Sequence, residues 1–227
     1  MNRGRRTGVL GGTFDPIHLG HLSAASAAAG ALALDEVLFV PSHRPPHRGV
    51  APGASASHRL AMVKLAVQAD ARFRASDIEL RVRTRSFTAV TLRALHALGY
   101  RASQLFFIIG SDAFAEIATW HDYPAVLDLA HFAVVSRPGR PLGSLATPLV
   151  ERTREIGPGV RLADDVLAEP RIVLIPAETP DVSSTDVRAR AAAGESLEGL
   201  VPTEVERYIR RHRLYAGADP DPSTATS

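Results

Sequence analysis

Two histidines near the start of the chain are spaced so that one helix would present both on the same side. His18 and His21 are three residues apart, and Gly20 between them carries no side chain. Residues three apart on a helix are surface neighbours, so the two imidazoles would share a face. Two imidazoles beside bare backbone suit a polyphosphate, which is bound by several N–H donors.

The residues before this pair are typical of a glycine-rich turn that leads into a helix. Gly11 and Gly12 end an apolar stretch, and glycine allows a ligand to approach the backbone closely. Asp15 followed by Pro16 predicts the helix start, because Asp caps a helix and Pro is tolerated in its first turn. A plain turn with two solvated histidines is the alternative, and it explains the isolated pair better than the whole string. The string therefore predicts a polyphosphate-binding turn made of Gly11, Gly12, Thr13, Phe14, Asp15 and Gly20.

A second polar segment, Ser183-Ser184-Thr185-Asp186-Val187-Arg188, lies far along the chain. Ser183 with Asp186 three residues later resembles a capping box, so this segment is expected to open a helix. Its hydroxyls and first N–H groups suit phosphate oxygens, and Arg188 one turn later has the forked geometry for them. By itself the segment is more often only a helix cap.

The remaining pattern is one of apolar strands alternating with helices, which indicates a parallel sheet covered on both faces. We predict an α/β fold, a Rossmann-like parallel sheet with helices on both faces and a small C-terminal helical part. Strands are expected at 7–14, 36–42, 78–82, 104–110, 131–138 and 171–178. Helices are expected at 19–34, 57–68, 88–98, 112–117, 124–129, 185–193 and 204–211.

Length and composition exclude several classes of protein. With 227 residues, 45% hydrophobic and 22% charged, the chain suits one globular domain, expected at 1–216, with a disordered tail at 217–227. The absence of cysteine excludes disulfides and thiol nucleophiles. No apolar run is long enough to span a bilayer, so a cytoplasmic protein without a membrane partner is expected. The arginines are scattered, which argues against a nucleic-acid partner.

The complete string Gly11-Gly12-Thr13-Phe14-Asp15-Pro16-Ile17-His18-Leu19-Gly20-His21 resembles the signature of the nucleotidyltransferases with a His-x-Gly-His motif. In detail the chain resembles the bacterial nicotinate-nucleotide adenylyltransferases from Gly8 to about Tyr215. Further segments match in the same order: Pro41 with Pro45-Pro46-His47-Arg48, Ser86-Phe87-Thr88-Ala89, Ile109-Gly110-Ser111-Asp112, Thr119-Trp120, Ser136-Arg137-Pro138-Gly139 and Ser183 to Arg188.

The resemblance implies that AMP passes from ATP to nicotinate mononucleotide, giving deamido-NAD and pyrophosphate. It implies catalytic roles for His18, His21 and Arg188, and a pyridine ring stacked on Trp120 with main-chain donors at Thr88 and His121. Mg²⁺ would enter on the ATP phosphates, with no metal ligands from the protein. The resemblance also implies that the polyphosphate held by the glycine-rich turn is that of ATP. Further ATP contacts are expected from Arg48, where the family often has lysine, and from Gly110, Asp112, Ser183, Ser184 and Thr185.

Other functions remain as alternatives. The acceptor could be nicotinamide mononucleotide or phosphopantetheine, and a nucleotide-binding sensor without catalysis is a further alternative. Retention of His18, His21 and Arg188 disfavours the sensor. A redox dinucleotide enzyme is disfavoured because Gly-x-Gly-x-x-Gly does not follow the first strand. The sequence leaves a homo-oligomer open.

Overall fold

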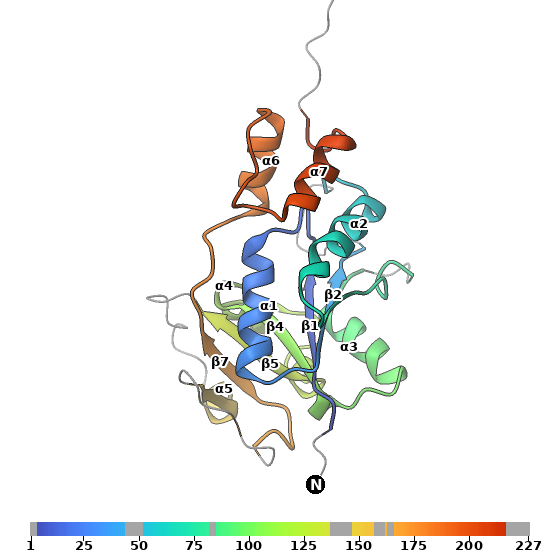
Figure 1. Cartoon of the computed structure of the whole chain (residues 1–227). Coiled ribbons are helices and arrows are strands. Elements are labelled where there is room, and N and C mark those ends of the chain that lie inside the picture. Colours follow the sequence, from blue (N-terminus) through green and yellow to red (C-terminus); the bar gives the residue numbers. More distant parts are fainter. Residues whose placement is uncertain are drawn as a thin grey trace, which may run out of the picture.

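In the part of the chain that the structure describes, seven parallel strands form one sheet in the order β3-β2-β1-β4-β5-β7-β6. Figure 1 shows this sheet. The computed structural model describes residues 4–43, 52–81, 85–136, 147–156, 162 and 166–216, with the side chains of 147 and 148 left out. The strands are β1 (Thr7–Gly12), β2 (Glu36–Pro41), β3 (Phe73–Ala75), β4 (Leu105–Gly110), β5 (His131–Ser136), β6 (Thr153–Glu155) and β7 (Ile172–Pro176).

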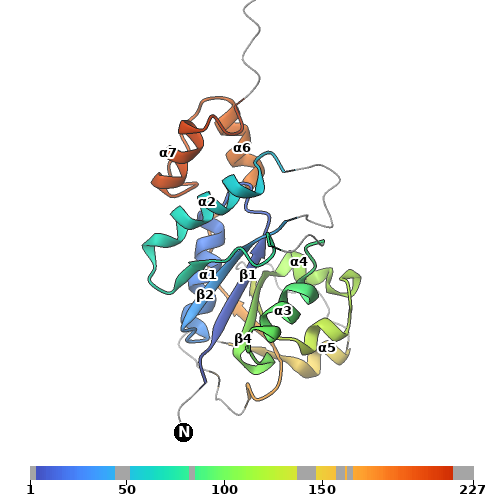
Figure 2. The same ribbon diagram turned by 90° about the vertical axis from the view of Figure 1, so that its right-hand side faces the viewer.

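Helices cover both faces of the sheet, as predicted (Figures 1 and 2). One core contains residues of α1 (Leu19–Ala31), α2 (Ala56–Ala66), α6 (Ser184–Ala192) and α7 (Thr203–Arg211). The other contains residues of α3 (Thr88–Ala97), α4 (Ser111–Ala115) and α5 (Thr147–Arg152). Short 3₁₀ helices lie at η1 (Val67–Ala69), η2 (Ala102–Gln104), η3 (Ile117–Thr119) and η4 (Ala125–Asp128).

Strand β4 shows why both faces are apolar. Phe106 and Ile108 pack in the first core, whereas Phe107 and Ile109 pack in the second. Successive side chains of a strand point to opposite faces, so a strand buried on both sides is apolar at every position. This is the pattern that made 104–110 recognisable as a strand.

The C-terminal helices α6 and α7 lie beyond the carboxyl ends of the strands, and α7 packs on α2 (Figure 2). The predicted small C-terminal helical part is therefore confirmed. The tail expected at 217–227 lies outside the described residues.

The strand predicted at 78–82 is wrong. Residues 77–81 form a turn in which the Leu80 N–H donates to the Asp77 carbonyl at 2.9 Å. The edge strand lies earlier, at β3, where Phe73 is aligned with Val37 of β2. Three residues are too few to show a periodic pattern, which is why the sequence did not reveal this strand. Helix α5 and strand β6 were also not predicted.

The helix start predicted at Asp15-Pro16 is wrong as well. Helix α1 begins at Leu19, with His18 as its N-cap residue. Asp15 is instead buried, with 1% of its surface exposed. Its partners are described with the site.

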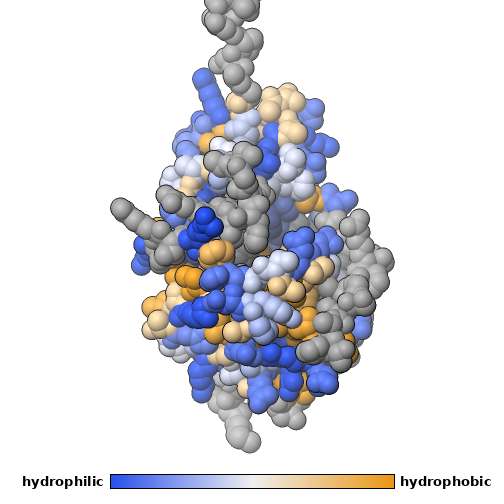
Figure 3. Space-filling view, turned by 180° about the vertical axis from the view of Figure 1, so that it is seen from behind, coloured by the Kyte–Doolittle hydropathy of each residue, from blue (hydrophilic) through white to orange (hydrophobic). Residues whose placement is uncertain are grey.

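The surface carries scattered apolar side chains. Among described residues the exposed large hydrophobic ones are Leu98 and Val150. On the face shown in Figure 3, hydrophobic residues alternate with hydrophilic ones. In the part of the chain that the structure describes, no helix is long and apolar enough to cross a membrane.

Because His131 is buried, we expect the folded protein to lose stability in mild acid. His131 is fully buried on β5, stacked on Phe106 with ring centroids 4.5 Å apart, and its Nδ1 accepts from the Arg171 N–H. Burial lowers the pKa of His131 to about 4. The unfolded chain takes up this proton below about pH 6.5, whereas the folded chain resists until about pH 4. The stability that neutral His131 contributes is thus fully present above about pH 6.5 and is lost as the pH falls from there toward about 4.

We expect this group to reduce the free energy of unfolding by roughly 2–3 kcal/mol at about pH 4.5 relative to neutral pH. Urea unfolding across this pH range measures the loss. His131→Asn keeps an acceptor for the Arg171 N–H but does not titrate there, so its stability should depend less on pH. The same pH dependence in wild type and variant would contradict the assignment.

Candidate active site

Strands β1 and β4 lie side by side, although β2 and β3 come between them in the sequence. The chain thus leaves β1 toward one edge of the sheet and continues from β4 toward the other. In such sheets ligands bind outside the carboxyl ends of the strands at this switch point. Two cavities lie there, of about 440 Å³ and 200 Å³. They share part of their lining: Leu10, His21, Ile108, Ile109 and Gly110.

The two histidines come together as predicted. The ring centroids of His18 and His21 are 3.7 Å apart. The backbone N–H of His18 donates to Nδ1 of His21 at 3.2 Å. Because Nδ1 is an acceptor, neutral His21 carries its hydrogen on Nε2, and this N–H is a donor for a ligand.

Burial, and next the charge of His18, keep the pKa of His21 well below its usual value. The ring of Phe14 supports His21 in an edge-on contact with centroids 5.0 Å apart. Phe14 itself is buried, so its side chain belongs to the core, and the predicted contact of this residue with ATP stays a prediction. His21 is therefore a fixed, neutral N–H donor between the two cavities.

Gly20 also makes room for a neighbouring side chain. A Cβ at this position would lie 3.1 Å from the His18 ring and 3.4 Å from the Pro180 carbonyl. The missing side chain thus makes room for the histidine in addition to exposing backbone. Gly20 lines the smaller cavity, with Gly110 and Asp112 at the carboxyl end of β4.

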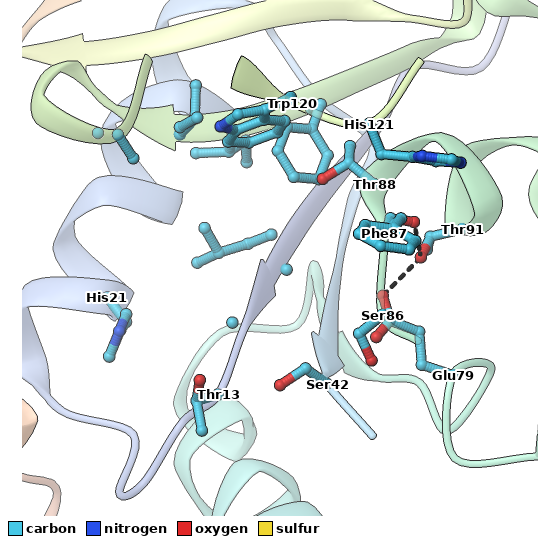
Figure 4. A pocket seen from close by; sticks show the side chains of 18 residues that line it. Thr13, His21, Ser42, Glu79, Ser86, Phe87, Thr88, Thr91, Trp120 and His121 are labelled. Atoms are coloured by element: carbon cyan, nitrogen blue, oxygen red, sulfur yellow. Dashed lines mark hydrogen bonds between the residues drawn. The ribbon is translucent and has the colours of Figure 1, made fainter. Parts of the chain in front are cut away.

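The larger cavity is lined by Thr88, Trp120 and His121, which were predicted to bind the acceptor, and also by Gly11, Gly12 and Thr13, which were predicted to bind ATP. Figure 4 shows Trp120 and Thr88 toward one end and His21 and Thr13 toward the other. Trp120 stands edge-on to Phe107, with centroids 6.1 Å apart. It is only partly buried and lines the wall of the cavity, where a flat ring of a ligand has access to it.

Helix α3 directs its N-terminus at this cavity. Its N-cap residue, Phe87, provides no side-chain acceptor, so the first N–H groups of the helix are not capped. Thr88 is the first of these residues. The positive end of the helix dipole lies there too, which favours a carboxylate.

Glu79, Ser86 and Thr91 also line the larger cavity, and sequence reasoning missed Glu79 and Thr91. Thr91 Oγ1 donates to Glu79 Oε1 at 2.5 Å. Burial raises the pKa of Glu79, and hydrogen bonds from Ser86, Thr91 and His43 only partly oppose this shift. In the sequence, the signal that could have identified Glu79 was its position as an acidic residue shortly before Ser86-Phe87-Thr88.

Asp15 lies beside the site, lines neither cavity and connects distant parts of the chain through hydrogen bonds. Its carboxylate accepts from the N–H groups of Gly53 and Ala54 at 2.8 and 3.0 Å and from the Tyr215 hydroxyl at 2.8 Å. Arg188 donates to the Asp15 carbonyl at 2.7 Å. A buried carboxylate finds its donors inside the protein, and a contact between Asp15 and ATP stays a prediction.

The capping box at the start of α6 is confirmed, since Ser183 Oγ accepts from the Asp186 N–H. Ser184 donates to the Pro16 carbonyl at 2.9 Å, and Thr185 accepts from Arg188 at 3.2 Å. In this structure the hydroxyls hold α6 against the turn after β1. Their contact with ATP phosphates, and that of Arg188, stays a prediction, and Arg48 lies outside the described residues.

The chain matches known proteins over most of its length. The family model described as cytidylyltransferase-like matches residues 9–190. A protein of Desulfitobacterium hafniense named "Probable nicotinate-nucleotide adenylyltransferase" is 40% identical over 211 residues, covering 93% of this chain and 96% of its own. One of Chromobacterium violaceum with the same name is 42% identical over 212 residues, covering 92% and 98%.

A solved structure of similar fold is the Plasmodium falciparum nicotinic acid mononucleotide adenylyltransferase complexed with NaAD. Its TM-score is 0.66 at 16% identity, and the match covers 93% of this chain and 98% of that one. The fold follows from the structural match, and the family follows from the sequence matches. The chain belongs to the cytidylyltransferase-like family and, within it, to the nicotinate-nucleotide adenylyltransferases.

Proposed function

We propose that the protein transfers AMP from ATP to nicotinate mononucleotide, giving deamido-NAD and pyrophosphate. The observation that carries this assignment is the position of His21, which lines both cavities at the switch point. The larger cavity suits nicotinate mononucleotide, with Trp120 available for the pyridine ring. The smaller one suits the adenosine part of ATP. The reacting phosphates then meet at His21.

The reaction needs little proton transfer. An oxygen of the 5′-phosphate of nicotinate mononucleotide attacks the α-phosphorus of ATP, and the bond to the pyrophosphate oxygen breaks. The attacking phosphate is already ionised, so catalysis consists of positioning and stabilisation of the developing charge. His18 and His21 hold the α-phosphate in this scheme. Arg188 is proposed to approach the leaving pyrophosphate.

Mg²⁺ is proposed to accompany ATP. Within the described ranges, no group of three or more His, Asp or Glu side chains is placed to hold a metal ion. Mg²⁺ commonly binds through substrate phosphate oxygens and water, and such a cation needs no cluster of protein ligands. When bound, the ion neutralises phosphate charge. The exposed Asp112 at the smaller cavity suits a ribose hydroxyl or a water of that ion.

We also propose that residues 1–216 work as one nucleotidyltransferase domain in the cytoplasm. The contacts that support a single domain join distant parts of the chain. Tyr215 and Arg188 both bond to Asp15 beside the glycine-rich turn. Separation of the C-terminal helices would therefore break the turn at the site.

We expect the larger cavity to favour nicotinate mononucleotide, the acid, over nicotinamide mononucleotide, the amide. Thr88 and His121 offer main-chain N–H donors, which suit a carboxylate but leave an amide NH₂ unpaired. Asp122 does not supply the missing acceptor, since it bonds to Arg93 and lines neither cavity. Glu79 lies beside Ser86, away from Trp120, and its Oε1 already accepts from Thr91 (Figure 4).

An unpaired NH₂ costs about 1–3 kcal/mol, and hydrogen bonds to the charged carboxylate add about 1.5–3 kcal/mol, so kcat/KM should favour nicotinate mononucleotide by at least about tenfold. Pyrophosphate release from Mg-ATP with each mononucleotide, alone and in competition, tests both the function and the preference. Equal use of the two would contradict the donor-only site. Release with neither would contradict the proposed function.

A further inference from the structure

We propose that Glu79 is a positioning residue for recognition of the nicotinate carboxylate, acting through Thr91 on the first turn of α3. The inference rests on the proposed function and adds a residue that holds the donor at Thr88 in place. Glu79 lies in the turn after β3, outside the helix that it would position. It lines the larger cavity together with Thr88 and Thr91 (Figure 4).

The connection runs through one hydroxyl. Thr91 Oγ1 lies 2.5 Å from Glu79 Oε1 and 3.4 Å from the Phe87 carbonyl. A hydroxyl has one hydrogen, and the shorter contact takes it. The Phe87 carbonyl is left to accept from the N–H groups of Val90 and Thr91, at 2.9 and 3.1 Å. Without Glu79, the hydroxyl would turn to its own helix, a contact that bends helices.

The same turn is held from its other side. The backbone N–H of His43, just beyond β2, donates to Ser86 Oγ at 2.8 Å. The Phe87 ring stacks on His121 with centroids 4.3 Å apart. Residues 86–88 are thus fixed between β2, Glu79 and His121. A shift of this turn would move the donors at Thr88 and His121 relative to each other.

The contact requires an acceptor oxygen at Glu79 and does not require a charge. A charged carboxylate in a cavity for an anionic substrate would repel it, whereas burial raises the pKa of Glu79 and thereby favours the neutral acid. Glutamine has the same shape and keeps an oxygen for the Thr91 hydroxyl. Alanine has no acceptor. Glu79→Gln is therefore the conservative variant, and Glu79→Ala and Thr91→Val each break the contact.

The test compares kcat, both KM values and the melting temperature of wild type, Glu79→Gln, Glu79→Ala, Thr91→Val and the Glu79→Ala/Thr91→Val double variant. Glu79→Ala and Thr91→Val should each raise KM for nicotinate mononucleotide about tenfold, the loss of one decade of binding. Their KM for ATP should stay within about twofold of the wild-type value, well below the tenfold increase in the other KM. Preference for the acid should fall in parallel. Glu79→Gln should retain wild-type values.

The double variant should resemble either single variant, because both remove one contact. Glu198→Ala, an exposed glutamate on a distant turn, serves as the matched control. An unchanged KM for nicotinate mononucleotide in Glu79→Ala would overturn the proposal. Equal increases in both KM values with a lower melting temperature would also overturn it, since they indicate general structural damage. These results differ from failure of the proposed function, in which wild type itself releases no pyrophosphate.

Discussion

Replacement of His21 by alanine is expected to reduce kcat by roughly 10²–10³-fold, the usual loss for one preorganised donor to a developing charge. The structure explains why no other group replaces it. The His18 N–H fixes the ring through Nδ1, and Phe14 supports it from the side. Water entering the space would lack this fixed orientation.

Steady-state rates of pyrophosphate release give the measurement, with circular dichroism to show that the fold persists. His58→Ala is the matched control, because His58 lies on α2, bonds to Tyr208 and lines neither cavity. It should leave kcat unchanged. A kcat of His21→Ala within about threefold of wild type, well short of the expected loss, would show that His21 is not a catalytic residue.

Replacement of Asp15 by alanine is expected to lower the free energy of unfolding by about 3–5 kcal/mol, as when one partner is removed from a buried charged network. Two backbone N–H groups and the Tyr215 hydroxyl would lose their shared acceptor. Arg188 would lose the nearby carboxylate, 3.9 Å from its Nη1. The melting temperature should fall by roughly 10 °C, given about 2–4 °C per kcal/mol at this chain length.

Urea and thermal unfolding measure this effect. Asp128→Ala is the control, since Asp128 is exposed and pairs with Arg152 on the surface, where such a pair is worth about 0–1 kcal/mol. Equal stability losses in the two variants would contradict the central structural role of Asp15. Loss of ATP affinity at full stability would instead support the prediction that Asp15 binds ATP.

The order of the main elements was predictable because each carries its own signal. Strand β4 is apolar at nearly every position, and Gly99 follows the C-cap residue of α3. His18 and His21 approach each other across the start of α1, because the N-cap residue and the third residue of a helix lie close enough for a side chain to accept the N-cap N–H. These features depend on neighbours within a few positions of the chain, so the sequence alone determined the Rossmann-like alternation, the histidine pair and the capped start of α6.

The tertiary structure decided the roles that depend on distant partners. Asp15 has the residue type of a helix cap, but its donors lie 38, 39 and 200 positions away, and burial made it a structural centre. Glu79 became part of the cavity wall because Thr91, 12 positions later, returns to it. A hydrogen bond between such residues depends on how the chain folds back on itself, and no local pattern of residues records that path.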